Sequence, residues 1–319
     1  MSKPPCISVI VPAHNSEAFI GQTLASIRVQ SFTDWECVVV DDGSKDQTCA
    51  VVEAVAALDG RVRLVRQRCG GSSMARNRGF LESCSFSEYV SFMDSDDVWE
   101  PHALETLAGR LGKSMGAVGA HGVAEFIDTQ GNPLDPGRFA AFGRRRLGYL
   151  DGEIREWPLE APTVFETLVW TGPLYPPGLL LARRSAYEKA GLFDVDLRHC
   201  EDWDMCLRLS RLGRLEFVNE VLLSYRRHQS NQSNDRRGSG EMVRQLQRKT
   251  FFSPENTPEQ HAMLRAGWKA WQVYKLKEKC RVARMGSLRE RYLSAVYAAA
   301  SVPVHAARYL RGYPTCRGV

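Results

Sequence analysis

Hydrophobic and polar positions alternate in two patterns along the first 115 residues. Between strand-like runs, apolar residues recur every three or four positions, which is the spacing of a helix with one apolar face. The β-branched runs that predict buried strands are Ile7 to Val11, Glu36 to Val40, Val62 to Val65 and Tyr89 to Met93. The predicted helices lie around Ile20 to Ile27, Val51 to Leu58, Ser73 to Glu82 and Leu104 to Leu111. Strands that alternate with single helices predict an α/β fold, with a mostly parallel, Rossmann-like sheet flanked by helices.

The alternation loosens after about residue 115, and residues 132–177 are rich in loop-forming residues. The elements expected beyond 115 are strands at Val118 to Ile127, near Leu179 to Arg183, near Leu215 and near Leu222, and a helix from about Asp202 to Leu212. Residues 241–319 are expected to be mostly helical. We therefore divide the chain into residues 1–115, residues 116–240 and a helical C-terminal extension, 241–319.

Composition and charge are those of a globular protein, with 44% hydrophobic and 25% charged residues. The net charge of +5 is uneven, because residues 241–319 hold 15 Lys and Arg against 5 Asp and Glu. Such a basic extension can face anionic lipid, although solvated helix faces have a similar composition. Nine cysteines without a C-x-x-C pair argue against a disulfide framework and a structural zinc site.

Segments that would cross or leave a membrane are not expected. No apolar stretch follows Met1, and the charge-free run Tyr292 to Ala307 is shorter than the roughly 20 apolar residues that span a bilayer. We therefore predict a cytoplasmic protein, with peripheral contact at the inner face of the membrane through residues 241–319 as an open possibility.

Polar residues follow the first two predicted strands. Pro12, Asn15 and Glu17 lie in the turn after the first strand, and Asp41 and Asp42 begin the turn after the second. Ligands of open α/β sheets bind at the carboxyl ends of the strands, so these positions are candidates for a nucleotide site. Two structural explanations stay open, because Asn15 can cap the next helix and an Asp-Gly pair can form an ordinary turn.

Two further motifs indicate a diphosphate and its cation. Gly70 and Gly71 lead into a predicted helix that carries Arg76, and free backbone N–H groups at a helix start bind phosphate. The sequence Asp94-Ser95-Asp96-Asp97 follows the fourth predicted strand. Three carboxylates within four residues repel one another unless a cation or water compensates, and Mg²⁺ and Mn²⁺ prefer such oxygen ligands. An acidic surface turn is the structural alternative.

The order of the segments P-A-H-N-S-E, V-V-D-D-G-S, A-R-N-R-G and D-S-D-D resembles that of the inverting glycosyltransferases of family 2, which have the GT-A fold. The resemblance covers roughly residues 6–230. It implies a nucleoside diphosphate sugar as donor, either a UDP-hexose or a UDP-N-acetylhexosamine, and Mn²⁺ or Mg²⁺ as cofactor. The donor-binding residues that it implies are Pro12, Asn15, Glu17, Asp41, Asp42, Arg76, Asp94, Ser95 and His228, and the metal ligands are Asp94 and Asp96.

The acidic pair Glu201-Asp202 opens a predicted helix, as in the later signature of the family. By this resemblance Asp202 is the general base, with Glu201 beside it. Inversion requires a carboxylate that takes the proton of the acceptor hydroxyl while this hydroxyl attacks opposite the leaving diphosphate. The alternative explanation is that acidic residues simply favour a helix N-terminus.

The segment Tyr225-Arg226-Arg227-His228 resembles a basic segment that family members carry near the diphosphate. His228 is a candidate metal ligand or phosphate contact, and Arg226 or Arg227 could neutralise the leaving group. The end of a surface strand is the alternative. Processive members carry Gln-x-x-Arg-Trp and transmembrane helices, which this sequence lacks, so we expect one sugar to be transferred per encounter.

Two other functions are alternatives to sugar transfer. A nucleotidyltransferase of the same fold needs a glycine-rich, basic loop after the first strand, and Pro12-Ala-His-Asn15 supplies none. A non-catalytic sugar-nucleotide-binding protein is expected to lack Asp202 or the D-x-D motif, and both are present. The acceptor is a sugar, a lipid-linked molecule or another small molecule, no nucleic acid is expected as a partner, and the sequence fixes no oligomeric state. Trp170, Tyr175 and Trp203 could stack on an acceptor sugar or belong to the core.

Overall fold

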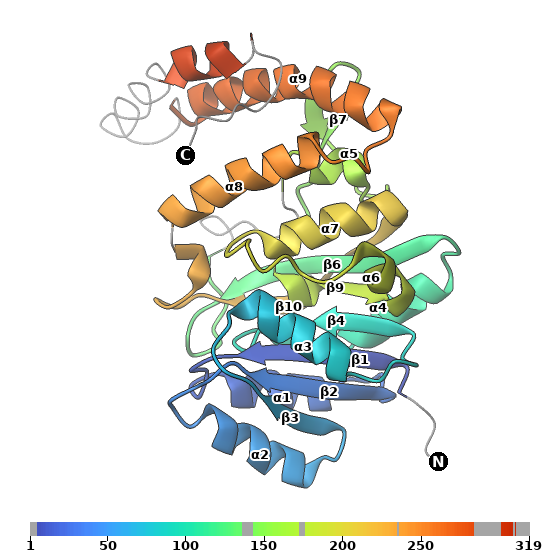
Figure 1. Cartoon of the computed structure of the whole chain (residues 1–319), viewed down its shortest axis with the longest axis vertical. Coiled ribbons are helices and arrows are strands. Elements are labelled where there is room, and N and C mark those ends of the chain that lie inside the picture. Colours follow the sequence, from blue (N-terminus) through green and yellow to red (C-terminus); the bar gives the residue numbers. More distant parts are fainter. Residues whose placement is uncertain are drawn as a thin grey trace. The chain divides into compact units, whose positions relative to one another are not determined.

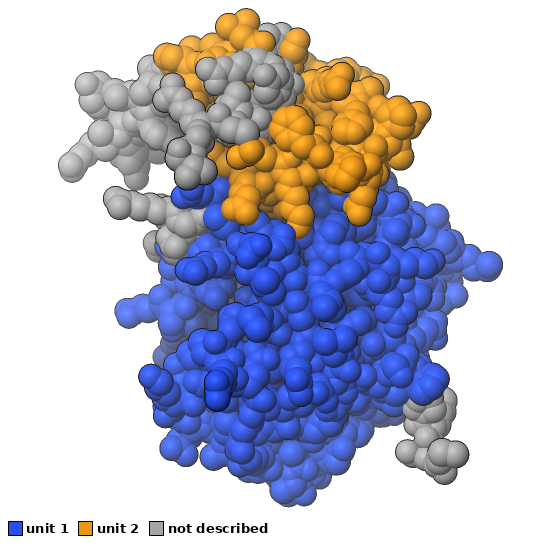
Figure 2. Space-filling view, in the orientation of Figure 1, with its two compact units in different colours: residues 1–145, 158–165, 172–242 blue, residues 146–157, 166–171, 243–319 orange. Residues whose placement is uncertain are grey.

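The computed structural model describes residues 5–135, 143–171, 176–234, 236–283, 301–308 and 310 (Figure 1). The chain forms two compact units (Figure 2). Unit 1 comprises residues 1–145, 158–165 and 172–242, and unit 2 comprises residues 146–157, 166–171 and 243–319. The division of roles between residues 1–115, 116–240 and 241–319 stays a prediction.

Unit 1 is built on one sheet of eight strands in the order β3-β2-β1-β4-β9-β6-β10-β5. The strands are β1 (Ile7–Ala13), β2 (Trp35–Asp41), β3 (Val62–Arg66), β4 (Tyr89–Phe92), β5 (Val98–Trp99), β6 (Ala117–Ile127), β9 (Leu180–Arg183) and β10 (Arg214–Arg226). Strand β9 is antiparallel to β4 and β6, β5 is antiparallel to β10, and the other neighbours are parallel. The prediction of a mostly parallel α/β sheet is therefore confirmed.

The strands expected near Leu215 and Leu222 form the single long strand β10. Its pairing with β6 shifts register between Phe217 and Val221 and again before Leu223. Such irregularities insert extra residues and bend a strand without ending it. The polar residues Asn219 and Glu220 lie between Leu215 and Leu222, and the irregular pairing is where they are accommodated.

Helices cover both faces of the sheet in unit 1 (Figure 1). They are α1 (Ile20–Arg28), α2 (Thr48–Leu58), α3 (Ser72–Glu82), α4 (Ala103–Gly112), α6 (Arg184–Ala190) and α7 (Glu201–Leu212). Helices α1, α2 and α4 contribute Leu24, Val52 and Leu104 to the core cluster on one face. Helices α3, α6 and α7 lie over the other face, where Tyr187 of α6 packs edge-on against Phe92.

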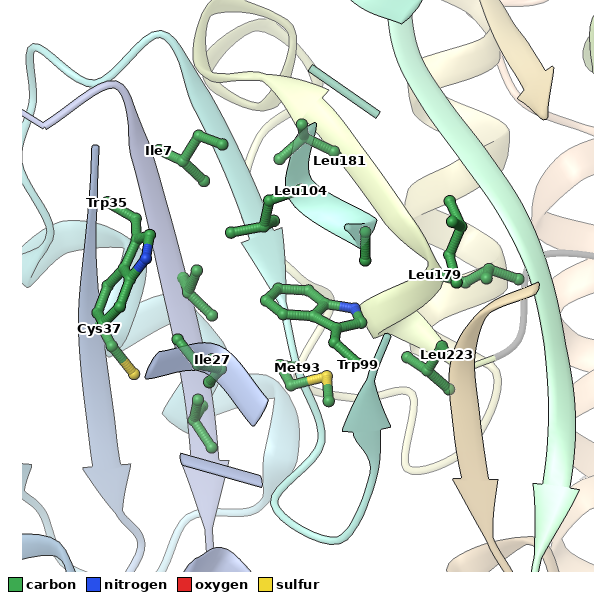
Figure 3. Packing of buried hydrophobic residues seen from close by; sticks show 14 of the residues in the cluster. Ile7, Ile27, Trp35, Cys37, Met93, Trp99, Leu104, Leu179, Leu181 and Leu223 are labelled. Atoms are coloured by element: carbon green, nitrogen blue, oxygen red, sulfur yellow. The ribbon is translucent and has the colours of Figure 1, made fainter. Parts of the chain in front are cut away.

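The larger core cluster gives the strand ends a rigid base. Ile27 and Leu104 of the helices, together with Ile7, Trp35 and Met93 from the sheet, are at most 2% exposed (Figure 3). Full burial of one such side chain stabilises the fold by about 1.5–3 kcal/mol relative to exposure. The loops at the carboxyl edge of the sheet therefore start from fixed positions.

Helix α3 lies unusually close to β1 and β2, because Gly79 faces the sheet. A Cβ atom at Gly79 would collide with the side chain of Ile10 and come within 3.1 Å of Val40. Close approach of backbone to neighbouring side chains is a common reason for glycine in a helix. This approach brings Arg76, one turn earlier on α3, under the carboxyl edge of the sheet.

Unit 2 contains the hairpin β7 (Leu147–Leu150) and β8 (Glu153–Glu156), and the long helix α9 (Pro258–Ala283). Trp170, Leu264 and Trp268 are buried within it, and Gly267 lies against the ring of Trp170. The hairpin falls in the segment that was expected to be loop-rich. The remaining elements are α5 (Phe165–Leu168), η1 (Pro177–Leu179), η2 (Gln232–Asn234) and α8 (Arg236–Phe251).

Among the described residues, every helix is too short or too polar to traverse a lipid bilayer. Most of the run Tyr292 to Ala307, which the sequence suggested as the longest charge-free stretch near the end, lies outside the described residues.

Candidate active site

The carboxyl ends of three parallel strands place the predicted polar turns at one edge of the sheet. Ala13 pairs in register with Asp41, and Ile10 with Phe92, so β1, β2 and β4 end at neighbouring positions. The turns after β1 and β4 are joined by a hydrogen bond of 2.7 Å between the hydroxyls of Ser16 and Ser95. The predicted base, ribose and metal segments are therefore brought together.

Asn15 and Glu17 connect the turn after β1 to the turn after β2. Asn15 has the positive φ of 49°, and its Oδ1 accepts the backbone N–H of Lys45 at 2.8 Å. Glu17 Oε2 accepts the N–H of Gln47 at 2.7 Å. Both side chains are exposed, so they remain accessible to a ligand while they hold the two turns together.

Asp42 holds the loop that precedes α3. Its carboxylate accepts the backbone N–H groups of Gly70 at 2.8 Å and Gly71 at 2.7 Å, and Nε2 of Gln67 at 2.7 Å. The amides of the glycine pair are thus occupied by Asp42, and the predicted phosphate contact of the free N–H groups at the start of α3 stays a prediction. Asp41 is also buried, and its carboxylate accepts the N–H of Ser44 at 3.3 Å, whereas Pro12 is half-buried near the end of β1.

Arg76 links the acidic turn to the start of α7. Its Nη2 donates to Asp94 Oδ1 at 2.8 Å and its Nη1 donates to Glu201 Oε1 at 2.7 Å. The side chain is only 5% exposed. Burial disfavours its charge, but the two carboxylates outweigh this effect, and the pKa of Arg76 lies above its ordinary value. The guanidinium is therefore a buried bridge between two segments that are far apart in the sequence.

Asp202 occupies the first turn of α7, next to the residue that binds Arg76. The helix is preceded by Cys200 in the left-handed region, with φ 65°. Asp202 is 7% exposed, and its Oδ1 accepts the N–H of Trp203 at 2.7 Å. Burial, together with the neighbouring charge of Glu201, raises the pKa of Asp202 to about 7. A carboxyl group with this pKa can accept a proton near neutral pH.

Asp96 points toward the end of β10 and meets His228. The distance between Asp96 Oδ2 and His228 Nε2 is 2.7 Å. The ring of His228 also packs on Phe19, with centroids 4.8 Å apart, and its Nδ1 lies 3.0 Å from Ser230 Oγ. Because a carboxylate oxygen only accepts, Nε2 donates its proton to Asp96 at this distance; a cation would replace that proton, and Ser230 could then accept a proton from Nδ1. The Asp96 carboxylate is an oxygen ligand of the kind that Mg²⁺ and Mn²⁺ prefer, and His228 is the nitrogen ligand nearest to it.

Asp97 and Arg226 are buried next to Asp96 and bind to each other. Asp97 Oδ1 accepts the backbone N–H of Arg226 at 2.9 Å, whereas its buried Oδ2 has no hydrogen-bond partner in the described part of the chain. Burial and the adjacent carboxylate of Asp96 raise the pKa of Asp97 well above its ordinary value. The guanidinium of Arg226 is fully buried and donates to the Asp96 carbonyl at 2.8 Å and to Gln22 Oε1 at 2.8 Å. Arg226 therefore holds the backbone of the acidic turn in place.

Asp94 has a different environment from Asp96. Burial raises its pKa, the charge of Arg76 opposes this effect, and the charge of Asp96 adds to it. Its Oδ1 is engaged by Arg76, whereas Asp96 is turned toward His228. The two ends of the D-x-D motif therefore contact different parts of the site.

Comparisons with known proteins identify the family of the chain. The sequence model described as Glycosyl transferase family 2 matches residues 8–191, which is more than half of the chain. The chain belongs to glycosyltransferase family 2. An uncharacterized glycosyltransferase of Haemophilus influenzae is 27% identical to it over 234 residues, which make up 72% of this chain and 67% of that protein. The chain spans about two thirds or less of the length of several such curated relatives.

Solved structures share the fold of this family 2 chain. A fragment of TarS from S. aureus in complex with UDP-GlcNAc superposes with a TM-score of 0.61 at 17% identity, covering 97% of this chain and 89% of the fragment. The mannosyltransferase PcManGT from Pyrobaculum calidifontis, in complex with GDP-Man and Mn²⁺, gives a TM-score of 0.59 at 18% identity, covering 98% and 85%. These likenesses confirm the expected GT-A type of α/β fold.

Two polar residues of the family 2 site were not predicted. Asn231 Oδ1 accepts the N–H of His228 at 2.6 Å, and its Nδ2 lies 3.4 Å from Asp96 Oδ2. Ser72 donates to Glu201 Oε1 at 3.0 Å. Asn231 could have been found from its position three residues after His228 in a loop that follows a strand, whereas the partner of Ser72 is 129 residues away and leaves no local signal.

The three aromatic residues that could stack on an acceptor sugar lie in different parts of the chain. Trp170 is buried in unit 2, where its ring lies 6.2 Å from that of Trp271. Tyr175 lies outside the described residues. Trp203 is half-buried in the first turn of α7, next to Asp202. Trp203 therefore adjoins the candidate base.

Proposed function

We propose that this family 2 protein transfers one sugar from a UDP-linked donor, a hexose or an N-acetylhexosamine, to an acceptor hydroxyl with inversion. The observation that carries the proposal is the bridge by Arg76 between Asp94 and Glu201. Through this bridge the acidic turn, which faces the donor diphosphate, is held beside the helix that presents Asp202. The buried cluster of Arg76, Asp94 and Glu201 thereby positions both the donor-binding turn and the general base.

The nucleoside end of the donor is assigned to the turns after β1 and β2, at Pro12, Asn15, Glu17, Asp41 and Asp42. The diphosphate is assigned to the edge at Ser95, Asp96 and His228. A divalent cation held by Asp96 and His228, with Asp94 as the further ligand expected from the sequence, would supply positive charge against the leaving diphosphate. The hydrogen bond of 2.7 Å between Asp96 and His228 places the two side chains face to face, where a cation would replace the shared proton.

Asp202 is assigned to proton transfer. The acceptor oxygen forms its bond to the anomeric carbon while the bond from that carbon to the diphosphate oxygen breaks, and the acceptor proton passes to the Asp202 carboxylate. The electron pair of the broken bond leaves with the diphosphate. Glu201 is assigned to positioning, because its Oε1 already accepts hydrogen bonds from Arg76 and Ser72.

The first experiment is incubation of the protein with a panel of nucleotide sugars and Mn²⁺, with release of the free nucleoside diphosphate as the signal. Asp202→Asn keeps the shape of the side chain and removes the proton acceptor. We expect UDP-sugar affinity to be retained and transfer to fall by about 10²- to 10⁴-fold. A fully active Asp202→Asn enzyme would refute the assignment of the base, and inactivity of Glu201→Gln beside it would move the base to Glu201.

The acceptor and its location remain proposals of the same kind. Residues 241–319 carry 15 Lys and Arg against 5 Asp and Glu, which suits an anionic membrane that presents a lipid-linked acceptor. Within unit 2 part of this charge is withdrawn from water, and this burial lowers the pKa of Lys275 to about 8. Cosedimentation of the full chain with acidic vesicles at low salt tests the contact. If the protein does not bind the vesicles, residues 241–319 are an ordinary helical cap or an oligomer interface.

A further inference from the structure

A second group of potential metal ligands lies at the nucleoside end of the candidate site, away from the D-x-D motif. A ring nitrogen of His14, a carboxylate oxygen of Asp42 and the sulfur of Cys69 all lie within 4.8 Å of one another. The three residues come from the turn after β1, the turn after β2 and the loop before α3. His14 and Cys69 are exposed, and Asp42 is buried.

Hydrogen bonds and backbone packing hold the loop that carries Cys69 close to Asp42. Asp42 accepts hydrogen bonds from Gln67 and Gly70, which flank Cys69 on both sides. The backbone of Cys69 also packs on Gly43, where an added Cβ would lie 3.1 Å from the Cys69 nitrogen. Asp42 therefore holds the Cys69 sulfur in place, and the same Asp42 carboxylate would bind the metal together with this sulfur.

His14 is held in a tautomer that metal-binding histidines use. Its Nδ1 lies 2.8 Å from the carbonyl oxygen of Asp42, so Nδ1 is the protonated nitrogen. The amide of Asn15, oriented by the N–H of Lys45, then donates to the Nε2 lone pair at 3.0 Å. A histidine whose ring N–H donates to a backbone carbonyl is the usual arrangement in metal sites, because it fixes the ring and raises the basicity of the other nitrogen.

The donor set defines the class of metal. We propose that His14, Asp42 and Cys69 bind a thiophilic transition metal of the Zn²⁺ class and that this metal competes with the nucleoside part of the donor. Thiolate and imidazole ligands select Zn²⁺ and its neighbours over Mg²⁺ and Mn²⁺. Ligand atoms around a tetrahedral Zn²⁺ lie about 3.3–3.7 Å apart, so the exposed His14 and Cys69 side chains need to move closer by no more than about 1.5 Å. Asp42 keeps lone-pair capacity, because its two oxygens accept three N–H groups out of roughly four positions.

Binding the metal replaces the Asn15 amide on His14 and releases the thiol proton of Cys69 to solvent. The competition with the donor rests on the proposed function, which places the nucleoside at Asn15, Asp41 and Asp42. The metal site itself rests only on the geometry of its three ligands. It is therefore an inhibitory site that is distinct in ligands and in metal preference from Asp96 and His228.

Cobalt is the probe, because a Co²⁺–thiolate bond gives a charge-transfer band that Co²⁺ bound by carboxylate and imidazole alone does not give. We expect the full-length protein to show this band, Cys69→Ser to lose it, and Cys280→Ser to keep it, since Cys280 is an exposed cysteine of unit 2. His14→Ala is expected to weaken cobalt binding by at least about tenfold. A wild-type protein without the band, or the same band in Cys69→Ser, overturns the site.

A second measurement avoids dependence on one spectrum. Zn²⁺ is expected to slow alkylation of Cys69 in the wild type and to leave it unchanged in His14→Ala, as followed by peptide mass. Equal protection in both proteins would count against the site. Uridine, which lacks chelating phosphates, is then added at saturation to the cobalt form. Loss of the band supports the competition, whereas persistence of the band with uridine bound removes the competition and contradicts the proposed nucleoside position, but leaves the metal site in place.

Discussion

Arg76 offers the sharpest test of how the site is assembled. In Arg76→Met the aliphatic stem is kept and the guanidinium is lost, so Glu201 and Asp94 lose their shared cation. Removal of one partner of a buried ion pair costs about 3–5 kcal/mol, because an uncompensated charge is left behind. Glu201 is 7% exposed and bears the full cost, whereas Asp94 is 24% exposed and is partly relieved by water. We therefore expect destabilisation toward the lower end of this range.

The assay is urea unfolding of the full chain, followed by tryptophan fluorescence and compared with Arg78→Met. Arg78 lies on the same helix, is 52% exposed and pairs with Glu82, so its loss should change stability by at most about 0.5 kcal/mol. Because the chain has two compact units, midpoints are compared rather than extrapolated free energies.

The double variant Arg76→Met, Glu201→Gln separates charge from packing. If the cost comes from an unpaired carboxylate, neutralising Glu201 should recover part of the lost stability, with a coupling of about 1 kcal/mol or more. Equal midpoints for Arg76→Met and Arg78→Met, or a coupling near zero, would refute the reasoning that Arg76 joins the two halves of the site.

Four further outcomes are expected from the same structure. Because the pKa of Asp202 is about 7, transfer should rise about tenfold per pH unit below pH 7 and level off above it, as rates between pH 5.5 and 8.5 would reveal. The same raised pKa stabilises the fold at low pH, so the urea midpoint should fall as pH rises from about 4 toward 7, and this part of the slope should vanish in Asp202→Asn. His228→Ala should weaken Mn²⁺-dependent UDP binding by at least about tenfold in calorimetry while metal-free UDP binding changes little; equal loss in both would argue for a direct phosphate contact. Gly79→Ala should lower the urea midpoint, at a cost of about 1–3 kcal/mol from the collision with Ile10, whereas Gly109→Ala, in open space on α4, should raise it.

Most of the secondary structure of unit 1 could be predicted, because it depends on local periodicity. The runs at Ile7 to Val11 and Glu36 to Val40 became β1 and β2, and the spacing of Ile20, Leu24 and Ile27 became α1. Strand β10 was split in two, since polar residues within a long, irregularly paired strand look like a turn. The hairpin of unit 2 was missed because its two four-residue strands give too short a pattern.

The candidate site could be predicted as a set of residues but not as a set of partners. Motif positions placed Asp94, Asp96 and Asp202 near the carboxyl edge through the resemblance to family 2. The sequence assigned Arg76 to a phosphate, whereas its partners in the structure are carboxylates, and one of them is 125 residues away. Likewise, His228 and Asp96 are separated by 132 residues. Such pairs form because the strand order of the sheet brings distant segments together, and the local spacing of residues in the sequence does not reveal them. The roles of these residues in catalysis stay predictions.

The balance of charge at the site explains why a cation and a proton both belong to the proposal. Five carboxyl groups, those of Asp94, Asp96, Asp97, Glu201 and Asp202, gather around two buried guanidinium groups, those of Arg76 and Arg226. Burial raises the pKa of Asp97 and Asp202, so the protein reduces the excess of negative charge by favouring their neutral forms. A diphosphate entering this cluster would add further negative charge. Under the proposed function, a divalent cation held by Asp96 and His228 would offset part of that charge. Donor binding and metal binding should therefore strengthen each other by the same factor.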